Sequence, residues 1–318
     1  MKEVKITVLM PAYNAGKYIA EAIESVLDQP IDDFELLIVN DGSTDNTVSV
    51  IQSFNDSRIR LLQQPRQGVV SALNEGLAKA KGYYIARFDA DDICFSNRLQ
   101  KQVDFLDQNP GYVLTGCDAE YITEAGEFLF NHQCTAYSHE DIMNQLYIYC
   151  PFIHSGVMYR KEEVLKAGGY PAYAHNFEDY LLWIRLAKYG NFCNLPERLI
   201  KVRLNPSSAT MDEKWRGRRF RKLKKEIIYK GEATKEEGDQ LLEIISKQDA
   251  VRIKNGAYYA LCGKKFLVNN YHPVKARINL GKSIRYFPFR LENYALYLIS
   301  FFPRSFINWL HLQSPNKL

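Results

Sequence analysis

Residues 36–45 read Leu-Leu-Ile-Val-Asn-Asp-Gly-Ser-Thr-Asp, an apolar run that ends in a polar turn. A short apolar run bounded by turn residues is typical of a buried strand, and a helical pattern over Thr44–Phe54 follows the turn. Ser43 or Thr44 can cap that helix, and Asp45 suits its positive end. The stretch therefore predicts a strand that leads through a short turn into a helix.

The same alternation of strand and helix runs through the first 110 residues. Strands are predicted at Ile6–Met10, Leu36–Val39, Ile59–Leu62 and Tyr84–Phe88, and helices at Tyr18–Leu27, Thr44–Phe54, Val69–Lys81 and Asn97–Gln108. This order predicts an α/β fold, in which a mostly parallel sheet is flanked by helices.

Polar residues directly follow three of these strands. They are Pro11-Ala12-Tyr13-Asn14, Asn40-Asp41-Gly42-Ser43 and Asp89-Ala90-Asp91-Asp92. Ligands of open α/β sheets bind outside the carboxyl ends of the strands. The placement therefore predicts one binding site at that edge of the sheet.

Asp89, Asp91 and Asp92 place three carboxylates within four residues. Such groups repel one another unless a cation or solvent relieves them. Mg²⁺ or Mn²⁺ takes few protein carboxylates and completes its shell with phosphate oxygens and water, so the cluster fits a metal bound to a diphosphate. In the other interpretation, Asp91 or Asp92 simply caps the next helix.

The turn at Asp41 also has two interpretations. Gly42 permits close approach of a ligand, and the helix behind it offers free N–H groups. The Asp41 carboxylate can accept a hydrogen bond from the imide N–H of a base. Taken alone, the same residues form an ordinary strand-to-helix turn.

The charge of the chain is unevenly distributed. Residues 1–210 carry a net charge of −8 and residues 211–318 a net charge of +12. The periodic pattern also changes near Asn205-Pro206. We therefore expect an α/β catalytic domain over residues 1–210 and a basic, aromatic, mostly helical region over residues 211–318.

Composition excludes several classes of protein. Glycine (18) and proline (12) occur at ordinary levels, which excludes disordered and collagen-like chains. The six cysteines form no Cys-x-x-Cys pair, so we expect reduced and mostly buried thiols. The first ten residues mix charged with apolar side chains and lack the apolar region of a signal peptide, which favours a cytoplasmic location.

A series of ordered motifs runs from residue 8 to residue 180. They read Val-Leu-Met-Pro-Ala-Tyr-Asn at 8–14, Ile-Val-Asn-Asp-Gly-Ser-Thr-Asp at 38–45, Asp89-Ala90-Asp91-Asp92, His154-Ser155-Gly156, Gly168-Gly169-Tyr170 and Glu178-Asp179-Tyr180. Together these motifs resemble the family 2 glycosyltransferases of GT-A fold. The resemblance implies a GT-A-like sheet flanked by helices, followed by a C-terminal helical extension that the motifs do not cover.

The resemblance implies roles for individual residues. Those expected to hold the nucleotide are Pro11, Ala12, Tyr13, Asn14, Asp41, Arg66, Asp89 and Ala90, with Arg66 as a phosphate contact. Asp91 and Asp89 would bind the metal, with Asp92 close by. Asp179 is similar to the general base of the family, and Glu178, which precedes it, is counted with it as catalytic.

Two positions depart from the family pattern. Arg203-Leu204-Asn205 stands where many relatives carry Arg-x-His, so metal ligation would rest on carboxylates and waters alone. Arg66-Gln67-Gly68 stands where Asn-x-Gly is common. We expect His154 to shape the site rather than to bind the metal, and we count Arg203 among the other site residues.

The implied function is that of an inverting glycosyltransferase that uses Mn²⁺ or Mg²⁺. It would move a sugar from a nucleotide-diphosphate donor, by default a UDP-sugar, to a hydroxyl of a glycan or lipid-linked acceptor in cell-surface polysaccharide or glycolipid assembly. Two alternatives stay open. One is a non-catalytic nucleotide-sugar-binding module. The other is a sugar-1-phosphate nucleotidyltransferase, although the loop after the first strand lacks the Gly- and Lys/Arg-rich sequence that such an enzyme needs.

The C-terminal region has two interpretations. The basic stretch Lys214–Lys225 is either a solvated helix face or a surface for peripheral attachment to anionic lipid on the inner face of the cell membrane. Leu291–Leu312 is interrupted by charged residues and proline, so we expect an interfacial or packed segment and not a spanning helix. Without a recognised motif we expect no nucleic-acid partner. The aromatic residues expected at a lipid interface are Tyr286, Phe287, Phe289, Tyr294, Tyr297, Phe301, Phe302 and Trp309.

Overall fold

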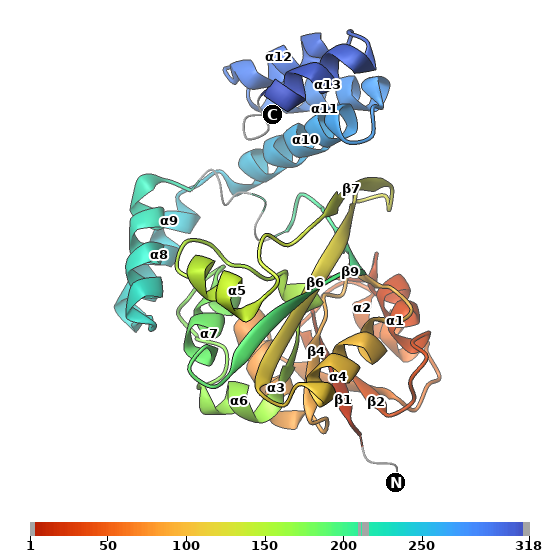
Figure 1. Cartoon of the computed structure of the whole chain (residues 1–318), viewed down its shortest axis with the longest axis vertical. Coiled ribbons are helices and arrows are strands. Elements are labelled where there is room, and N and C mark those ends of the chain that lie inside the picture. The colour runs from red at the N-terminus through yellow and green to blue at the C-terminus, as the bar shows by residue number, and fades with distance from the viewer. Residues whose placement is uncertain (1–3, 209–210, 212–215, 314–318) are drawn as a thin grey trace. The chain divides into compact units, whose positions relative to one another are not determined.

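We describe the protein from a computed structural model that covers residues 4–208, 211 and 216–313, with side chains up to residue 309. The chain forms two compact units, each assembled from three stretches of sequence (Figure 1). That residues 1–210 form a catalytic domain and residues 211–318 a separate C-terminal region stays a prediction. The first unit comprises Met1–Ala119, His132–Val202 and Leu223–Asp239, and the second comprises Glu120–Asn131, Arg203–Lys222 and Gln240–Leu318.

The sheet has a parallel half and an antiparallel half. In the described part of the chain its strand order is β3-β2-β1-β4-β8-β6-β9-β5, and β7 pairs with β6. Strands β1 to β4 run parallel, whereas β8 is antiparallel to β4 and β6, and β5 is antiparallel to β9. The bounds are β1 (Ile6–Ala12), β2 (Phe34–Asp41), β3 (Ile59–Gln64), β4 (Tyr84–Arg87), β5 (Ile93–Cys94), β6 (Tyr112–Ile122), β7 (Phe128–His132), β8 (Met158–Arg160) and β9 (Asn191–Arg203).

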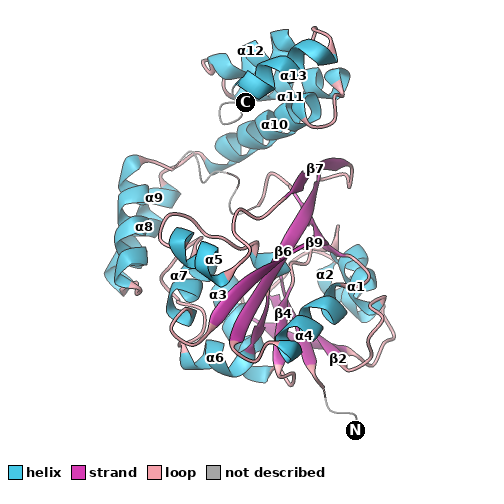
Figure 2. Cartoon of the chain, viewed as in Figure 1, coloured by secondary structure: helices cyan, strands magenta, loops and turns pink. Residues whose placement is uncertain are grey.

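Helices flank this sheet, which confirms the predicted α/β class (Figure 2). Apolar residues at helical spacing explain the burial of the first helix, since Ile19, Ala22, Ile23 and Val26 all lie inside. The helices of this part are α1 (Ile19–Leu27), α2 (Thr47–Gln52), α3 (Val69–Lys79), α4 (Arg98–Gln108), α5 (His139–Gln145), α6 (Lys161–Lys166) and α7 (Glu178–Leu186).

The strand order creates the point at which a site can form. The chain passes from β1 to β2 and β3 on one side and then returns to β4 on the other side of β1. Loops that leave the carboxyl ends of strands on the two sides diverge there, and open α/β sheets bind ligands in the space between them. The fold therefore places the polar turns after β1, β2 and β4 at the same edge of the sheet.

The remaining helices follow β9, and the predicted C-terminal helical extension is confirmed. The second unit has its own buried cluster, which includes Leu204, Tyr258, Phe266, Leu280 and Leu296. In the part of the chain that is described, none of the helices combines the length and the apolar character that crossing a bilayer requires. The helices are α8 (Arg218–Lys230), α9 (Lys235–Ser246), α10 (Ala250–Val268), α11 (Pro273–Tyr286), α12 (Leu291–Ile299) and α13 (Arg304–Gln313).

Two smaller predictions can also be compared with the structure. The six cysteines are free, and four of them are buried, as expected. The basic stretch Lys214–Lys225 is helical from Arg218 onward, while residues 212–215 lie outside the described residues.

Candidate active site

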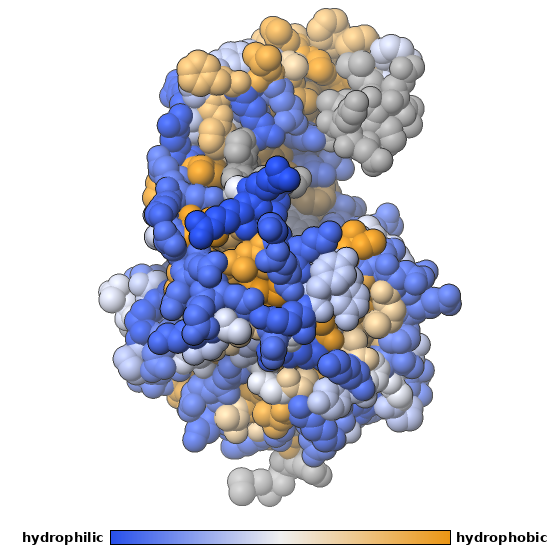
Figure 3. Space-filling model, turned by 90° about the vertical axis from the view of Figure 1, so that its left-hand side faces the viewer, coloured by the Kyte–Doolittle hydropathy of each residue, from blue (hydrophilic) through white to orange (hydrophobic). Residues whose placement is uncertain are grey.

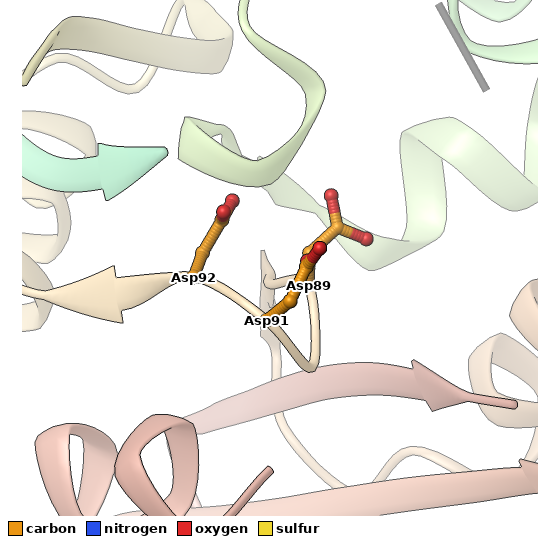
Figure 4. Close-up of side chains that lie close together, drawn as sticks. All are labelled: Asp89, Asp91 and Asp92. Atoms are coloured by element: carbon orange, nitrogen blue, oxygen red, sulfur yellow. The ribbon is translucent and has the colours of Figure 1, made fainter. Parts of the chain in front are cut away.

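The turn after β4 gathers the three predicted carboxylates. Ligand oxygens of Asp89, Asp91 and Asp92 all lie within 4.8 Å of one another, and Figure 4 shows the three side chains pointing to the same side of the turn. Asp92 is buried, and the other two are half-buried. The helix-capping interpretation is wrong, because β5 follows the turn and the N-cap of α4 is Asn97.

A buried arginine that the sequence analysis missed lies against this cluster. Arg87, the last residue of β4, is 4% exposed and forms an ion pair with Asp89. Burial opposes its charge, but Asp89 and then the more distant acidic groups outweigh burial and raise the pKa of Arg87. The signal was present in the sequence as a charged residue inside the otherwise apolar run Tyr84–Phe88.

The two residues predicted to be catalytic lie at the start of α7. Glu178 and Asp179 occupy its first turn, and both are half-buried. Burial first, and the neighbouring charge of Asp179 second, raise the pKa of Glu178 to about 7. Arg87 and Asp89 also act on the pKa of Glu178, so the structure brings this turn and the acidic turn after β4 within electrostatic range.

His154 belongs to a hydrogen-bonded group behind the acidic turn. Its Nε2 lies 3.0 Å from the hydroxyl of Tyr170, which in turn lies 3.2 Å from the hydroxyl of Tyr159. Loss of solvation and the charge of Arg87 hold the pKa of His154 well below its ordinary value, so the ring is neutral. The adjacent Ser155 accepts the Asp89 N–H through its Oγ at 3.1 Å.

The loops after β1 and β2 are tied together by side chains. The Asn14 N–H donates to Ser43 Oγ (3.0 Å), and Asn14 Oδ1 accepts the Thr44 N–H (2.9 Å). Asp45 accepts the Gly16 N–H at 3.0 Å. The prediction that Ser43 or Thr44 caps α2 is wrong, because these residues bind the β1 loop and α2 begins only at Thr47.

Asp41, at the end of β2, is the centre of a second group. Its buried carboxylate accepts hydrogen bonds from the N–H of Gln67 (2.8 Å) and of Gly68 (2.9 Å), from Gln64 Nε2 (2.7 Å) and from Arg66. Burial alone would raise the pKa of Asp41, but these hydrogen bonds together lower it. The carboxylate is therefore ionised at neutral pH.

Arg66 also covers an aromatic face of the β1 loop. Its guanidinium carbon lies 3.6 Å from the centre of the Tyr13 ring, and 51% of the Arg66 side chain is exposed. Tyr13 and Asp41 are therefore brought together through Arg66. Pro11 and Ala12 form the last residues of β1, opposite Val39 and Asn40 of β2.

The Asp41 group and the acidic turn are separate. They lie at the ends of β2 and β4, with β1 between these strands. Neighbouring strands are about 4.8 Å apart, so the two groups are roughly 10 Å apart across the sheet. A cavity of about 610 Å³ opens beside the Asp41 group and is lined by Val39, Leu62, Gln63, Gln64, Gln67, Ser71, Asn74 and Glu75, none of which was predicted as a site residue.

Arg203 lies in the second unit, where its guanidinium donates to the carbonyl oxygen of Glu124 at 3.2 Å. Ala90, inside the acidic turn, is 6% exposed and so offers chiefly its backbone to a ligand. The residues that the sequence analysis missed are thus Arg87, Ser155 and Gln64, whose partners are known only from the fold.

Comparison with known proteins connects this geometry to a family. A glycosyltransferase of Haemophilus influenzae without a known role is 32% identical over 241 residues, which span 70% of this chain and 73% of that protein. The amylovoran biosynthesis glycosyltransferase AmsE of Erwinia amylovora is 30% identical over 66% of this chain and 80% of its own length. A relative from Rickettsia bellii is longer, and the match spans 30% of it.

Solved structures share the fold. Residues 1–349 of S. aureus TarS in complex with UDP align with a TM-score of 0.55 and 16% identity over 98% of this chain and 92% of that fragment. The mannosyltransferase PcManGT of Pyrobaculum calidifontis, in complex with GDP-Man and Mn²⁺, aligns with a TM-score of 0.54 and 19% identity over 96% of this chain and 87% of its own. The family model of glycosyl transferase family 2 matches residues 7–169, and the chain belongs to this family.

Proposed function

We propose that the protein transfers a sugar from a nucleotide-diphosphate donor to an acceptor hydroxyl with inversion at the anomeric carbon. The observation that carries the proposal is the group formed by Asp89, Asp91 and Asp92 with the turn at Glu178 within electrostatic range. A non-catalytic binding module would not need the turn of Glu178 and Asp179 near the three carboxylates. TarS in complex with UDP supports a uridine nucleotide as the default donor.

The three carboxylates fit a divalent cation. Their oxygens are the hard ligands that Mn²⁺ and Mg²⁺ prefer, and the 4.8 Å spread lets more than one of them reach the same ion. Asp91 and Asp89 would hold the ion, with Asp92 beside them. When bound, it would offset the negative charge of the departing diphosphate. Arg87 forms an ion pair with Asp89 and so helps to hold its carboxylate in place.

Asp179 acts in this proposal as the general base. It removes the proton of the acceptor hydroxyl while that oxygen attacks the anomeric carbon and the diphosphate leaves from the opposite face. Glu178, whose pKa is about 7, carries a proton during part of the physiological range and so limits the negative charge beside Asp179. His154 holds Tyr170 and shapes the wall of the site.

The base and ribose of the donor bind at the other group in this proposal. Pro11, Ala12, Tyr13 and Asn14 form one wall, and Asp41 accepts the imide N–H after Arg66 has released one acceptor position. The freed guanidinium then faces the phosphates. Asp89 and Ala90 line the route to the diphosphate, and Arg203, which donates to the Glu124 carbonyl oxygen, stays a proposed site residue.

The acceptor is proposed as a glycan or a lipid-linked hydroxyl in cell-surface polysaccharide or glycolipid assembly, on the cytoplasmic side of the membrane. AmsE, a relative of amylovoran biosynthesis, supports this class of acceptor. A sugar-1-phosphate nucleotidyltransferase remains less favoured, because the Pro11–Gly16 loop lacks basic residues for a triphosphate.

The Asp179→Asn variant tests the proposed base. Donor binding, measured by calorimetry with UDP and Mn²⁺, should stay near that of the wild type. Transfer should fall by about 10²-fold or more, because general-base catalysis contributes that much. Glu162→Gln, which changes an exposed acid in the first turn of α6, is the matched control. Wild-type turnover of Asp179→Asn would refute the assignment.

A further inference from the structure

Helix α12 exposes apolar side chains at helical spacing. Leu291, Tyr294 and Leu298 are 80%, 40% and 63% exposed, and they follow one another at intervals of three and four residues. The opposite side of the helix carries its buried residues, Asn293 and Leu296. Residues three and four apart share one helix face. The helix thus carries apolar side chains on both sides, and only the side with Leu296 and Asn293 is packed against the protein.

The exposed apolar surface continues beyond the helix. Phe301 and Phe302, in the turn that leads to α13, are 62% and 48% exposed, and Trp309 on α13 is 52% exposed. Phe306 joins them, since its ring stacks on Phe302 at 4.7 Å and on Trp309 at 6.0 Å between centroids. We call the residues Leu291, Tyr294, Leu298, Phe301, Phe302 and Trp309 the apolar stripe, and Figure 3 shows apolar side chains gathered over the C-terminal helices.

The structure separates the aromatic residues expected at a lipid interface into packed and exposed ones. Tyr286 stacks on Tyr259, and a Cβ at Gly256 would meet the Phe287 ring at 2.2 Å, so these two side chains serve packing. Tyr297 is half-buried beside Phe301. Phe289, by contrast, is 92% exposed just before α12.

Two arginines lie next to the apolar stripe, and Glu292, the acidic residue of α12, is paired. Arg277 lies over the Phe301 ring at 4.5 Å, and Arg304 directly follows the turn after Phe302. Glu292 forms ion pairs with Arg290 at 2.7 Å and with Lys264 at 3.8 Å. From residue 250 onward the sequence contains 11 basic residues and one acidic residue. Arg277 and Arg304 thus place positive charge next to the stripe.

We propose that the apolar stripe inserts into the interfacial layer of an anionic lipid bilayer, while the arginines around it contact the lipid headgroups. Exposed aromatic and aliphatic side chains flanked by arginine are the composition of interfacial helices. A second copy of the chain fits less well, because two such surfaces would bring like charges together. With nine residues, α12 lies in the interface and does not cross the bilayer.

Co-sedimentation of the full chain with vesicles tests the proposal. The wild type should bind vesicles of phosphatidylcholine with phosphatidylglycerol far better than phosphatidylcholine alone. The double variant Leu291→Ser, Leu298→Ser should lower the partition coefficient by roughly tenfold or more, since each buried CH₂ accounts for about fourfold. Arg277→Gln with Arg304→Gln should lower it about fivefold per residue, and only with the anionic vesicles.

Val251→Ser is the matched control, because Val251 is 74% exposed on α10 and lies outside the stripe. It should bind vesicles within twofold of the wild type. Equal binding by the Leu291→Ser, Leu298→Ser variant would overturn the proposal. So would a lipid-free dimer in light scattering that this variant dissociates, because the stripe would then join two copies. The assay contains neither donor nor acceptor, so its outcome is independent of the transfer reaction.

Discussion

Asp41 carries as many hydrogen bonds as a carboxylate can readily accept. Four donors, two of them main-chain N–H groups, occupy the roughly four acceptor positions of its oxygens. A base imide N–H can reach Asp41 only when one donor leaves. Arg66 is the donor that can leave at the lowest cost, because its side chain is half-exposed, whereas Gln67 and Gly68 donate through the main chain.

The Arg66→Ala variant measures the two effects of this residue. Uridine should bind at least as well as to the wild type, because Tyr13 and one acceptor of Asp41 become available. UDP should lose about tenfold in affinity relative to uridine, because a charge-assisted hydrogen bond to phosphate is worth about 1.5–3 kcal/mol. Calorimetry with both ligands checks this. An unchanged ratio of the two affinities would mean that Arg66 never contacts phosphate.

The raised pKa of Glu178 predicts that the free energy of unfolding depends on pH. In the folded protein its pKa is about 7, against a model-compound value of 4.5, so the folded state binds more protons between these two pH values. The contribution of Glu178 to stability therefore falls as pH rises through this window. Glu178→Gln has no carboxyl group to titrate, so its stability relative to the wild type should rise by roughly 2–3 kcal/mol from the lower to the upper end of this window.

Urea unfolding at both ends of the window, in EDTA, checks this difference. EDTA is needed because a cation near Asp89 would lower the pKa of Glu178. Two stability curves that stay parallel across the window would show that Glu178 titrates normally in the folded state.

Among the elements, α3 depends on a close approach to the sheet. A Cβ at Gly76 would lie 2.2 Å from Leu9 Cδ1 and 3.1 Å from Val39 Cγ2, and both of these side chains are fully buried. Gly76→Ala should therefore destabilise the protein by about 1–3 kcal/mol, the usual cost of overpacking. Since α3 starts at Val69, directly after Gly68, a shift of α3 would also disturb the main-chain donors to Asp41.

Gly281→Ala in α11 is the control for this variant. Nothing lies within 4 Å of a Cβ at Gly281, so alanine should stabilise the helix by roughly 0.5–1 kcal/mol. Thermal unfolding of the two variants should shift in opposite directions. A loss of stability in both would mean that helix propensity and not packing against the sheet decides the result.

At the scale of the whole molecule, the two units should respond differently to metal. Ligands of the acidic turn belong to the first unit, whereas the second unit has a buried cluster made of its own residues. Mn²⁺ at 100 times its Kd should stabilise the first unit by about 2.7 kcal/mol. Hydrogen exchange resolved by peptide should then slow in β1 to β4, and little in α10 to α13.

Asp91→Ala should abolish this protection by Mn²⁺, because it removes one of the proposed ligands. Equal protection in the variant and in the wild type would place the ion elsewhere. Protection that covers both units alike would show that they unfold as one.

The sequence by itself determined the order of the elements in the first part of the chain and several of their ends. The predicted helix from Val69 and the predicted strand from Ile59 start where the structure has them, and the fourth helix ends at Gln108 as predicted. Local periodicity and turn chemistry suffice for this because they act over a few neighbouring residues. Since parallel strands end at one edge, the polar turns after them could also be placed together.

Only the tertiary structure decided which partners these residues have. The ion pair of Arg87 with Asp89 and the four donors around Asp41 depend on loops that meet across strands. The uncovered side of α12 is a similar case. A helix that is apolar on both sides has no periodic signal to tell its packed side from its exposed side, because that difference arises from contacts between segments distant in the sequence.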